Sequence, residues 1–150
     1  MAGGTLRDKN MAFAMAVADR DADAVVASLK SGAQVHYNDD FALRSAAWLG
    51  YTDIAELLLK NGANVHANGD EPLFTAIKAR DNVMIEMLLA KGASLQAVCD
   101  TKKGMLDRES LELISKIQSR DLHAASEKRA AELKKKAKKI PHLIIKARGP

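Results

Sequence analysis

The sequence predicts an all-α solenoid of stacked antiparallel helix pairs with a helical C-terminal cap and extension. Three observations support this prediction: a phrase that returns every 30 residues, apolar residues at helical spacing within each copy, and no alternation of strand type. The phrase ends each copy as Gly32-Ala33-Gln34-Val35-His36, Gly62-Ala63-Asn64-Val65-His66 and Gly92-Ala93-Ser94-Leu95-Gln96. Units of this kind bury their apolar faces only against neighbouring units, so we expect a binding surface rather than an enzyme.

Each copy is predicted to hold two helices. In the clearest copy, Leu43, Ala46 and Ala47 fall on one face of a first helix, because they are spaced by three and four residues. The small alanines allow a second helix to approach closely. A broader apolar stripe on that second helix is formed by Ile54, Leu57, Leu58 and Leu59.

The ends of these helices have their own signals. Gly50 stands where a first helix must stop, and Gly62 stands just past a second helix, where a positive φ is usual. Asp40 and Asp70 precede first helices and are expected to cap their amide groups. Pro72 fits a first helical turn, where its missing N–H costs nothing.

The repeated phrases resemble those of the ankyrin repeat. Residues 41–51, FALRSAAWLGY, take the places of the first-helix phrase TPLHxAAxxGH, and residues 71–81 and, more weakly, 11–21 are further copies. Residues 54–63, IAELLLKNGA, take the places of the second-helix phrase VVxLLLxxGA and recur at 84–93. The resemblance covers about residues 8–100 and implies the ankyrin fold.

The period is 30 residues instead of the usual 33. The missing residues fall between Val65 and Leu73, where the family places its β-hairpin finger, so we expect a tight turn there. Short repeats of this type are similar to those of large DNA viruses and some phages.

Composition limits the class of protein. The apolar content is 47%, which is typical of a folded chain, and the single cysteine, Cys99, excludes an internal disulfide and favours a reducing compartment. No apolar stretch is long enough to span a membrane, and the N-terminus lacks a secretory signal. We therefore expect a cytoplasmic protein, in the host cytoplasm if it is viral.

The C-terminal third departs from the repeats. We expect repeats over residues 1–100, a degenerate capping repeat over 101–126, and a basic helical tail over 127–150. Residues 100–104 are interpreted as a loop. The apolar face of the cap would consist of Met105, Leu106, Leu111, Leu113, Ile114 and Ile117. A helix would then project outward and end before Pro141.

The resemblance implies a partner-binding groove. Trp48 and Leu49 stand between the alanine pair and Gly50, at places that face the concave side of ankyrin repeats. The alternative is that both pack against a neighbouring helix. The pair Asp39-Asp40 would favour a basic partner or would cap a turn. The residues expected at the partner surface are Tyr37, Asp39, Phe41, Arg44, Trp48, Leu49, Phe74 and Lys78.

Catalytic and metal-binding patterns are not found in the sequence. His36 and His66 are equivalent, but Gln96 takes the third place, so we expect a hydrogen bond that orders each loop rather than a metal site. Cys99 has no cysteine or histidine partner that would make it a nucleophile. We expect no catalytic residue, cofactor, metal or small-molecule substrate, and therefore no enzyme.

The basic character of the chain lies in its tail. Residues 1–126 have 14 Lys and Arg against 17 Asp and Glu, whereas residues 127–150 have nine against two. The cluster Lys134, Lys135, Lys136, Lys138 and Lys139 could bind a polyanion. The alternatives are a solvated helix end, where the helix dipole favours cations, and contact with an acidic protein.

Together these patterns predict a non-catalytic protein–protein interaction module that binds its partner through the concave face. If the viral resemblance holds, the partner would be a host protein that is inhibited. The alternatives are a nucleic-acid-associated adaptor anchored by the tail, and an assembly component that associates through the tail helix or through residues 143–145.

Overall fold

The computed structural model describes residues 4–139, and the regular secondary structure of these residues is entirely helical. The elements are α1 (Leu6–Ala18), α2 (Ala22–Lys30), α3 (Tyr37–Leu49), α4 (Thr52–Lys60), α5 (Ala67–Ala79), α6 (Asn82–Ala90), α7 (Leu95–Lys102), the 3-10 helix η1 (Lys103–Met105) and α8 (Arg108–Lys139). The described part of the chain has no strand, and the predicted all-α class is confirmed.

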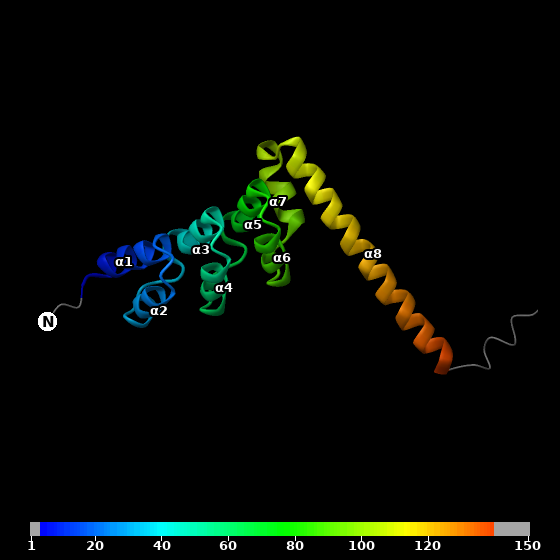
Figure 1. The fold of residues 1–150 in the computed structure, drawn as a ribbon, viewed down its shortest axis with the longest axis horizontal. Helices are drawn as coiled ribbons and strands as arrows, with labels where there is room; N and C mark the ends of the chain where they lie inside the picture. Colours follow the sequence, from blue (N-terminus) through cyan, green and yellow to red (C-terminus); the bar gives the residue numbers. More distant parts are fainter. Residues whose placement is uncertain (1–3, 140–150) are drawn as a thin grey trace, which may run out of the picture. The chain divides into compact units, whose positions relative to one another are not determined.

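The first seven helices belong to one compact unit, Met1–Ser110. Figure 1 shows the first helices of the repeats, α1, α3 and α5, in one row and the second helices, α2, α4 and α6, in another. Within the first row, α3 packs against both α1 and α5, and α5 also packs against α7. The 30-residue period of the sequence is therefore one helix pair.

The core of this unit lies between successive pairs. Leu43, Ala46 and Ala47 are completely buried in α3, and so are Ile54 and Leu58 in α4. Burying each of the larger side chains stabilises the fold by about 1.5–3 kcal/mol. The predicted buried face of the first helix is confirmed, and its alanines are fully buried.

The helix ends follow the predicted chemistry. Gly50 ends α3 with a φ of 71°, and Gly62 follows α4 with a φ of 92°. Arg20 and Arg80, which stand one repeat before and after Gly50, adopt φ values of 55° and 57° although they are not glycines. This left-handed position is thus a property of the repeat, and glycine meets it with the least strain.

A left-handed turn precedes the right-handed part of both α3 and α5. Residues 38–40 and residues 68–70 all have φ between 50° and 68°. Asn, Asp and Gly, which fill these places, are the residue types that best tolerate that conformation. The predicted tight turn in place of the finger is confirmed, and Pro72 lies in the first right-handed turn that follows, as expected.

Asp40 links its own repeat to the next one. It is buried, and its Oδ1 accepts the backbone N–H of Asn64 at 2.8 Å. Nδ1 of His36 lies 3.0 Å from Oδ2 of Asp40. Because an ionised carboxylate only accepts, His36 carries a proton on Nδ1. One carboxylate therefore orders a loop and joins two units.

The same arrangement recurs along the unit. Asp70 accepts from the backbone N–H of Ser94 and from His66, and Asn10 accepts from the backbone N–H of Gln34. The hydrogen bond expected for each histidine is confirmed. The capping role predicted for Asp40 and Asp70 is wrong, because their carboxylates bind the following repeat instead of their own helix.

The segment after Ala97 also differs from its prediction. Residues 100–102 are helical and complete α7, where a loop was expected. Ser94 caps this helix, and Leu95 and Val98 are buried, so local apolar content outweighs the polar composition. Oγ1 of Thr101 lies 2.7 Å from O of Ala97 and 3.2 Å from O of Gly69, and it can donate to either oxygen.

A second unit comprises Leu111–Pro150, and α8 runs through its described part without a break. The helix thus crosses the predicted boundary at residue 126. Met105 was expected on the apolar helix face of the cap, but it lies exposed in η1. Ile114 and Ile117 are buried. The domain boundaries stay a prediction, and the motif at residues 143–145 lies outside the described residues.

Candidate partner-binding face

The exposed side of α3 holds the largest exposed aromatic side chain. Trp48 is 75% exposed, whereas its neighbour Ala47 is completely buried. A cavity of about 340 Å³ lies beside it, between α3 and α5. Its lining residues are Phe41, Arg44, Ser45, Trp48, Leu49, Glu71 and Thr75.

A second cavity of about 310 Å³ adjoins the same tryptophan. It is lined by Trp48, Thr75, Lys78 and Ala79. Because Trp48 and Thr75 line both cavities, the indole ring stands between two hollows on one face. We call this surface, from Phe41 on α3 to Ala79 on α5, the Trp48 face.

Helical spacing explains why these side chains share a face. Phe41, Ser45 and Trp48 follow one another at intervals of four and three residues along α3. Leu43 and Ala47 point into the core, which turns the first set outward. The sequence pattern that builds the core therefore also builds the Trp48 face.

The charged groups of this face are paired within the chain. Nε of Arg44 lies 3.3 Å from Oε2 of Glu71, which makes an ion pair, although this buried Nε makes no hydrogen bond. Nη1 of Arg44 donates a hydrogen bond to O of Asn38 at 3.3 Å. Nζ of Lys78 donates to Oδ2 of Asp107 at 2.7 Å. This hydrogen bond holds the pKa of Asp107 well below its usual range. Among residues 4–139, the indole ring of Trp48 has no such partner.

The structure brings together five of the predicted surface residues. Phe41, Arg44, Trp48, Leu49 and Lys78 line the two cavities. Tyr37 and Asp39 are exposed at the left-handed turn but line neither cavity, and Phe74 is half-buried and also lines neither. Their role in partner binding stays a prediction.

Other members of the face were not predicted. Ser45, Glu71 and Thr75 also line the cavities. Their signal was available, because Ser45 lies four residues after Phe41 and Thr75 lies one period after Ser45. Because these residues are polar or small, the sequence alone did not indicate that they belong to a binding face.

Apolar exposure continues on α1. Met11 and Met15 are 58% and 60% exposed and stand one period before Phe41 and Ser45. Since α1 packs against α3, these methionines extend the apolar surface by one repeat. Methionine adapts its shape to a partner more easily than a branched side chain does.

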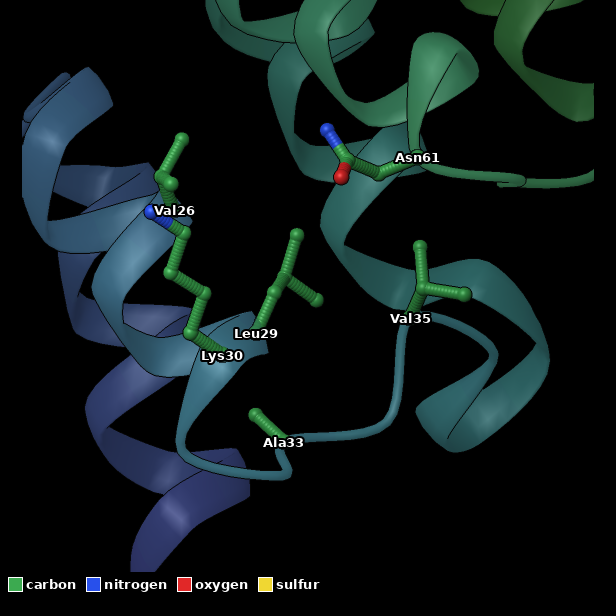
Figure 2. Close-up of a pocket in the computed structure, with 6 residues that line it drawn as sticks. All are labelled: Val26, Leu29, Lys30, Ala33, Val35 and Asn61. Carbon is green, nitrogen blue, oxygen red and sulfur yellow. The ribbon is translucent and has the colours of Figure 1, made fainter.

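A further hollow of about 350 Å³ lies between α2 and the end of α4. Figure 2 shows Leu29 between the two sides of this hollow, with Val35 and Asn61 opposite α2. Val26 stands where later repeats have Glu56 and Glu86. The pocket-lining residues are Val26, Leu29, Lys30, Ala33, Val35 and Asn61.

The sequence explains this second hollow. In the next repeat Glu56 pairs with Lys60 at 3.0 Å and covers the surface there. Val26 cannot pair with Lys30, so Lys30 makes no ion pair within residues 4–139 and the apolar floor stays open. The valine at the position where later repeats have glutamate is the sequence feature that could have indicated this hollow.

The remaining candidate groups are dispersed. No cluster of His, Cys, Asp and Glu among the described residues could hold a metal ion, and Cys99 is a free, partly buried thiol. Lys134, Lys135, Lys136 and Lys138 are exposed on α8 and have no ion pair within the described part of the chain. The side chain of Lys139 lies outside the described part of the chain. In the same part of the chain, no helix is both long and apolar enough to cross a membrane.

Helix pairs of one length, each joined to the next by a buried polar side chain, define a repeat protein. A family model described as ankyrin repeats matches residues 11–99 in three copies, and the chain belongs to this family. Comparisons with curated proteins and with solved structures returned no match. Ankyrin repeats are in general protein–protein interaction modules and are typically not enzymes.

Proposed function

We propose that this chain is a non-catalytic module that binds a partner protein through the Trp48 face. The observation that supports the proposal is the 75% exposed indole of Trp48 between two cavities. Large aromatic side chains beside pockets supply much of the binding free energy in protein interfaces. A partner would cover Trp48 and insert an apolar side chain into the larger cavity.

The charged rim fits this role. Arg44 is already paired with Glu71, and Lys78 with Asp107, so a partner need not neutralise either cation. The side chains around Trp48 are also held in place, which lowers the entropy lost on binding. The partner surface should accordingly be apolar at its centre.

The test is capture from a lysate with the wild-type chain and with a Trp48→Glu, Leu49→Glu double variant. Both residues are exposed, so the variant should keep its helical circular dichroism. Val83→Glu is a matched control, because Val83 is 67% exposed and lies on α6, away from the face. Loss of a partner in the double variant alone supports the proposal; equal capture by all three chains contradicts it.

The period of the repeat supports a more specific proposal, inhibition of a host protein. The 30-residue unit is similar to repeats of large DNA viruses and phages, and on that basis the partner would be a host protein that the chain inhibits in the cytoplasm. Identification of the captured protein and an assay of its activity with and without the chain would test this role.

A second candidate is a nucleic-acid-associated adaptor anchored by the basic tail. Four exposed lysines without ion pairs favour it, since each could neutralise a phosphate. Binding to duplex DNA or RNA should then weaken steeply with salt and disappear when residues 127–150 are removed. Capture that survives nuclease treatment and this truncation would contradict the adaptor.

A further inference from the structure

The exposed side of α8 carries a leucine every 11 residues. Leu111, Leu122 and Leu133 are 45%, 74% and 64% exposed. Eleven residues complete three turns of an α-helix, so the three leucines lie in line along one side of the helix. Within the described part of the second unit, no packing accounts for this regular line of apolar side chains.

Most residues on the same side between the leucines are small. The helical period places Ser115, Ser119, Ser126, Ala130 and Ala137 there, all exposed, and Gln118 and Arg129 lie at the other edge of this side. The buried residues Ile114 and Ile117 lie off this line. We call the line from Leu111 to Ala137 the leucine stripe. Small residues allow another helix to approach closely, and the leucines provide apolar area to bury.

We propose that the leucine stripe pairs two copies of the chain through antiparallel α8 helices. The distribution of charge along α8 indicates that its partner is a second copy of the chain and that the two helices run antiparallel. Residues 108–127 have three Lys and Arg against four Asp and Glu, whereas residues 128–139 have seven against one. An antiparallel copy places each basic segment beside residues 109–120 of the other chain, which have two Lys and Arg against two Asp and Glu, whereas a parallel copy would place the two strongly basic segments together.

Side-chain size fits the same direction. When two helices are related by a two-fold axis near residue 124, Leu111 meets Ala137 and Leu122 meets Ser126 of the other copy. Leu133 then meets Ser115 of that copy. Each leucine of the stripe thus faces a small residue, which is the alternation that interdigitated helix pairs require. This inference is independent of the function proposed for the Trp48 face.

The first experiment is sedimentation of the nuclease-treated full chain over a series of concentrations. The mass should rise from 16.2 kDa towards twice that value. A Leu122→Glu, Leu133→Glu variant should stay at the mass of one chain. The control Ala124→Glu, Ala131→Glu adds the same charges to exposed positions on another side of α8 and should still dimerise.

The outcomes separate clearly when helicity is confirmed by circular dichroism for each variant. A single-chain mass at every concentration overturns the proposal. So does a dimer that survives the leucine substitutions, because its interface would lie elsewhere. Equal loss in both variants also contradicts it, since the leucine stripe would then have no special role.

A cross-linking experiment tests the direction. In a Cys99→Ser background, the single-cysteine chains Ser119→Cys and Ala130→Cys keep all three leucines. The two positions are about 16 Å apart along one helix, too far for a disulfide within one chain. Antiparallel pairing predicts a 119–130 disulfide between the two chains on mixing. Disulfides that join only identical positions would indicate parallel pairing and overturn the proposal.

Discussion

At the scale of the residue, a few buried polar side chains determine how each repeat joins the next. Asp40 and Asp70 are 3% and 2% exposed, and each accepts a backbone N–H from a residue 24 positions later. Asn10 does the same without a charge. A buried N–H that loses its acceptor is costly, so these side chains stabilise the interfaces between repeats.

Replacing Asp40 by alanine removes the acceptor for the N–H of Asn64 and the partner of His36. Asp39→Ala is the matched control, because Asp39 has the same left-handed backbone and is exposed. We expect Asp40→Ala to lower the free energy of unfolding in urea by about 2 kcal/mol more than Asp39→Ala does. Equal losses would show that the carboxylate contributes nothing beyond the turn.

The ion pair of Lys78 and Asp107 predicts a pH dependence. The pKa of Asp107 is lowered from 3.8 by the hydrogen bond from Lys78 and by those with Ser110. A lowered pKa in the folded state stabilises the fold above the unfolded value, and this contribution is lost as pH falls through the folded value. Asp107→Asn should therefore be less stable than the wild type at neutral pH.

The difference in urea midpoint between the two chains should shrink as the pH is lowered below 3.8. Lys78→Met should show the same pattern, since it removes the other partner. A difference that stays constant from neutral to acidic pH would exclude ionisation of Asp107 as the cause.

At the scale of the element, the short left-handed turn distinguishes these repeats. It fits between the repeated phrase and the first helix only because Asn, Asp and Gly occupy residues 38–40 and 68–70. The turn also directs Asp40 and Asp70 towards the next repeat. The shortened period and the buried links between repeats are thus consequences of the same local geometry.

Gly69→Ala tests this turn. Gly69 has a φ of 68°, and an added Cβ would lie 3.1 Å from Oγ1 of Thr101. We expect a loss of about 1–2 kcal/mol in the free energy of unfolding, measured in urea. Gly104→Ala is the control, because that position has neither a positive φ nor a contact within 4 Å. Similar stabilities for both variants would mean that the turn tolerates a side chain.

The elements were largely predictable, because their signals are local. Helical spacing identified the buried face of Leu43, and glycines identified the helix ends. The resemblance to ankyrin repeats indicated the exposed place of Trp48. The role of Asp40 was not predictable from neighbouring residues, because its partner lies 24 positions away. Residues 100–102 were mistaken for a loop, since their helix depends on buried Leu95 and Val98 rather than on local propensity.

The residues of the Trp48 face also divide into those that the sequence predicts and those that it does not. Phe41 and Trp48 follow from the resemblance to ankyrin repeats, whereas Glu71 belongs to the cavity only because α5 packs beside α3. The pairing of Lys78 with Asp107 spans 29 residues and has no sequence signature. Residues that a periodic pattern does not mark became visible only with the packing of neighbouring repeats.

At the scale of the whole molecule, two units with different surfaces share one chain. The repeat unit has an apolar face with its charges paired internally, and the described part of the second unit is a basic helix with a leucine stripe. Stacked repeats are stable through contacts between neighbours, so their exposed face is free to vary. We therefore assign partner recognition to the Trp48 face and self-association to α8, as separate proposals.

The most direct test of the central claim uses the single tryptophan of the chain, Trp48. Incorporation of 5-fluorotryptophan gives one ¹⁹F resonance that reports only on the environment of this ring, even when the captured partner has tryptophans of its own. On titration with that partner, the account predicts that the resonance shifts and becomes protected from a soluble paramagnetic quencher. A complex that forms while the resonance stays unshifted and fully accessible would contradict it.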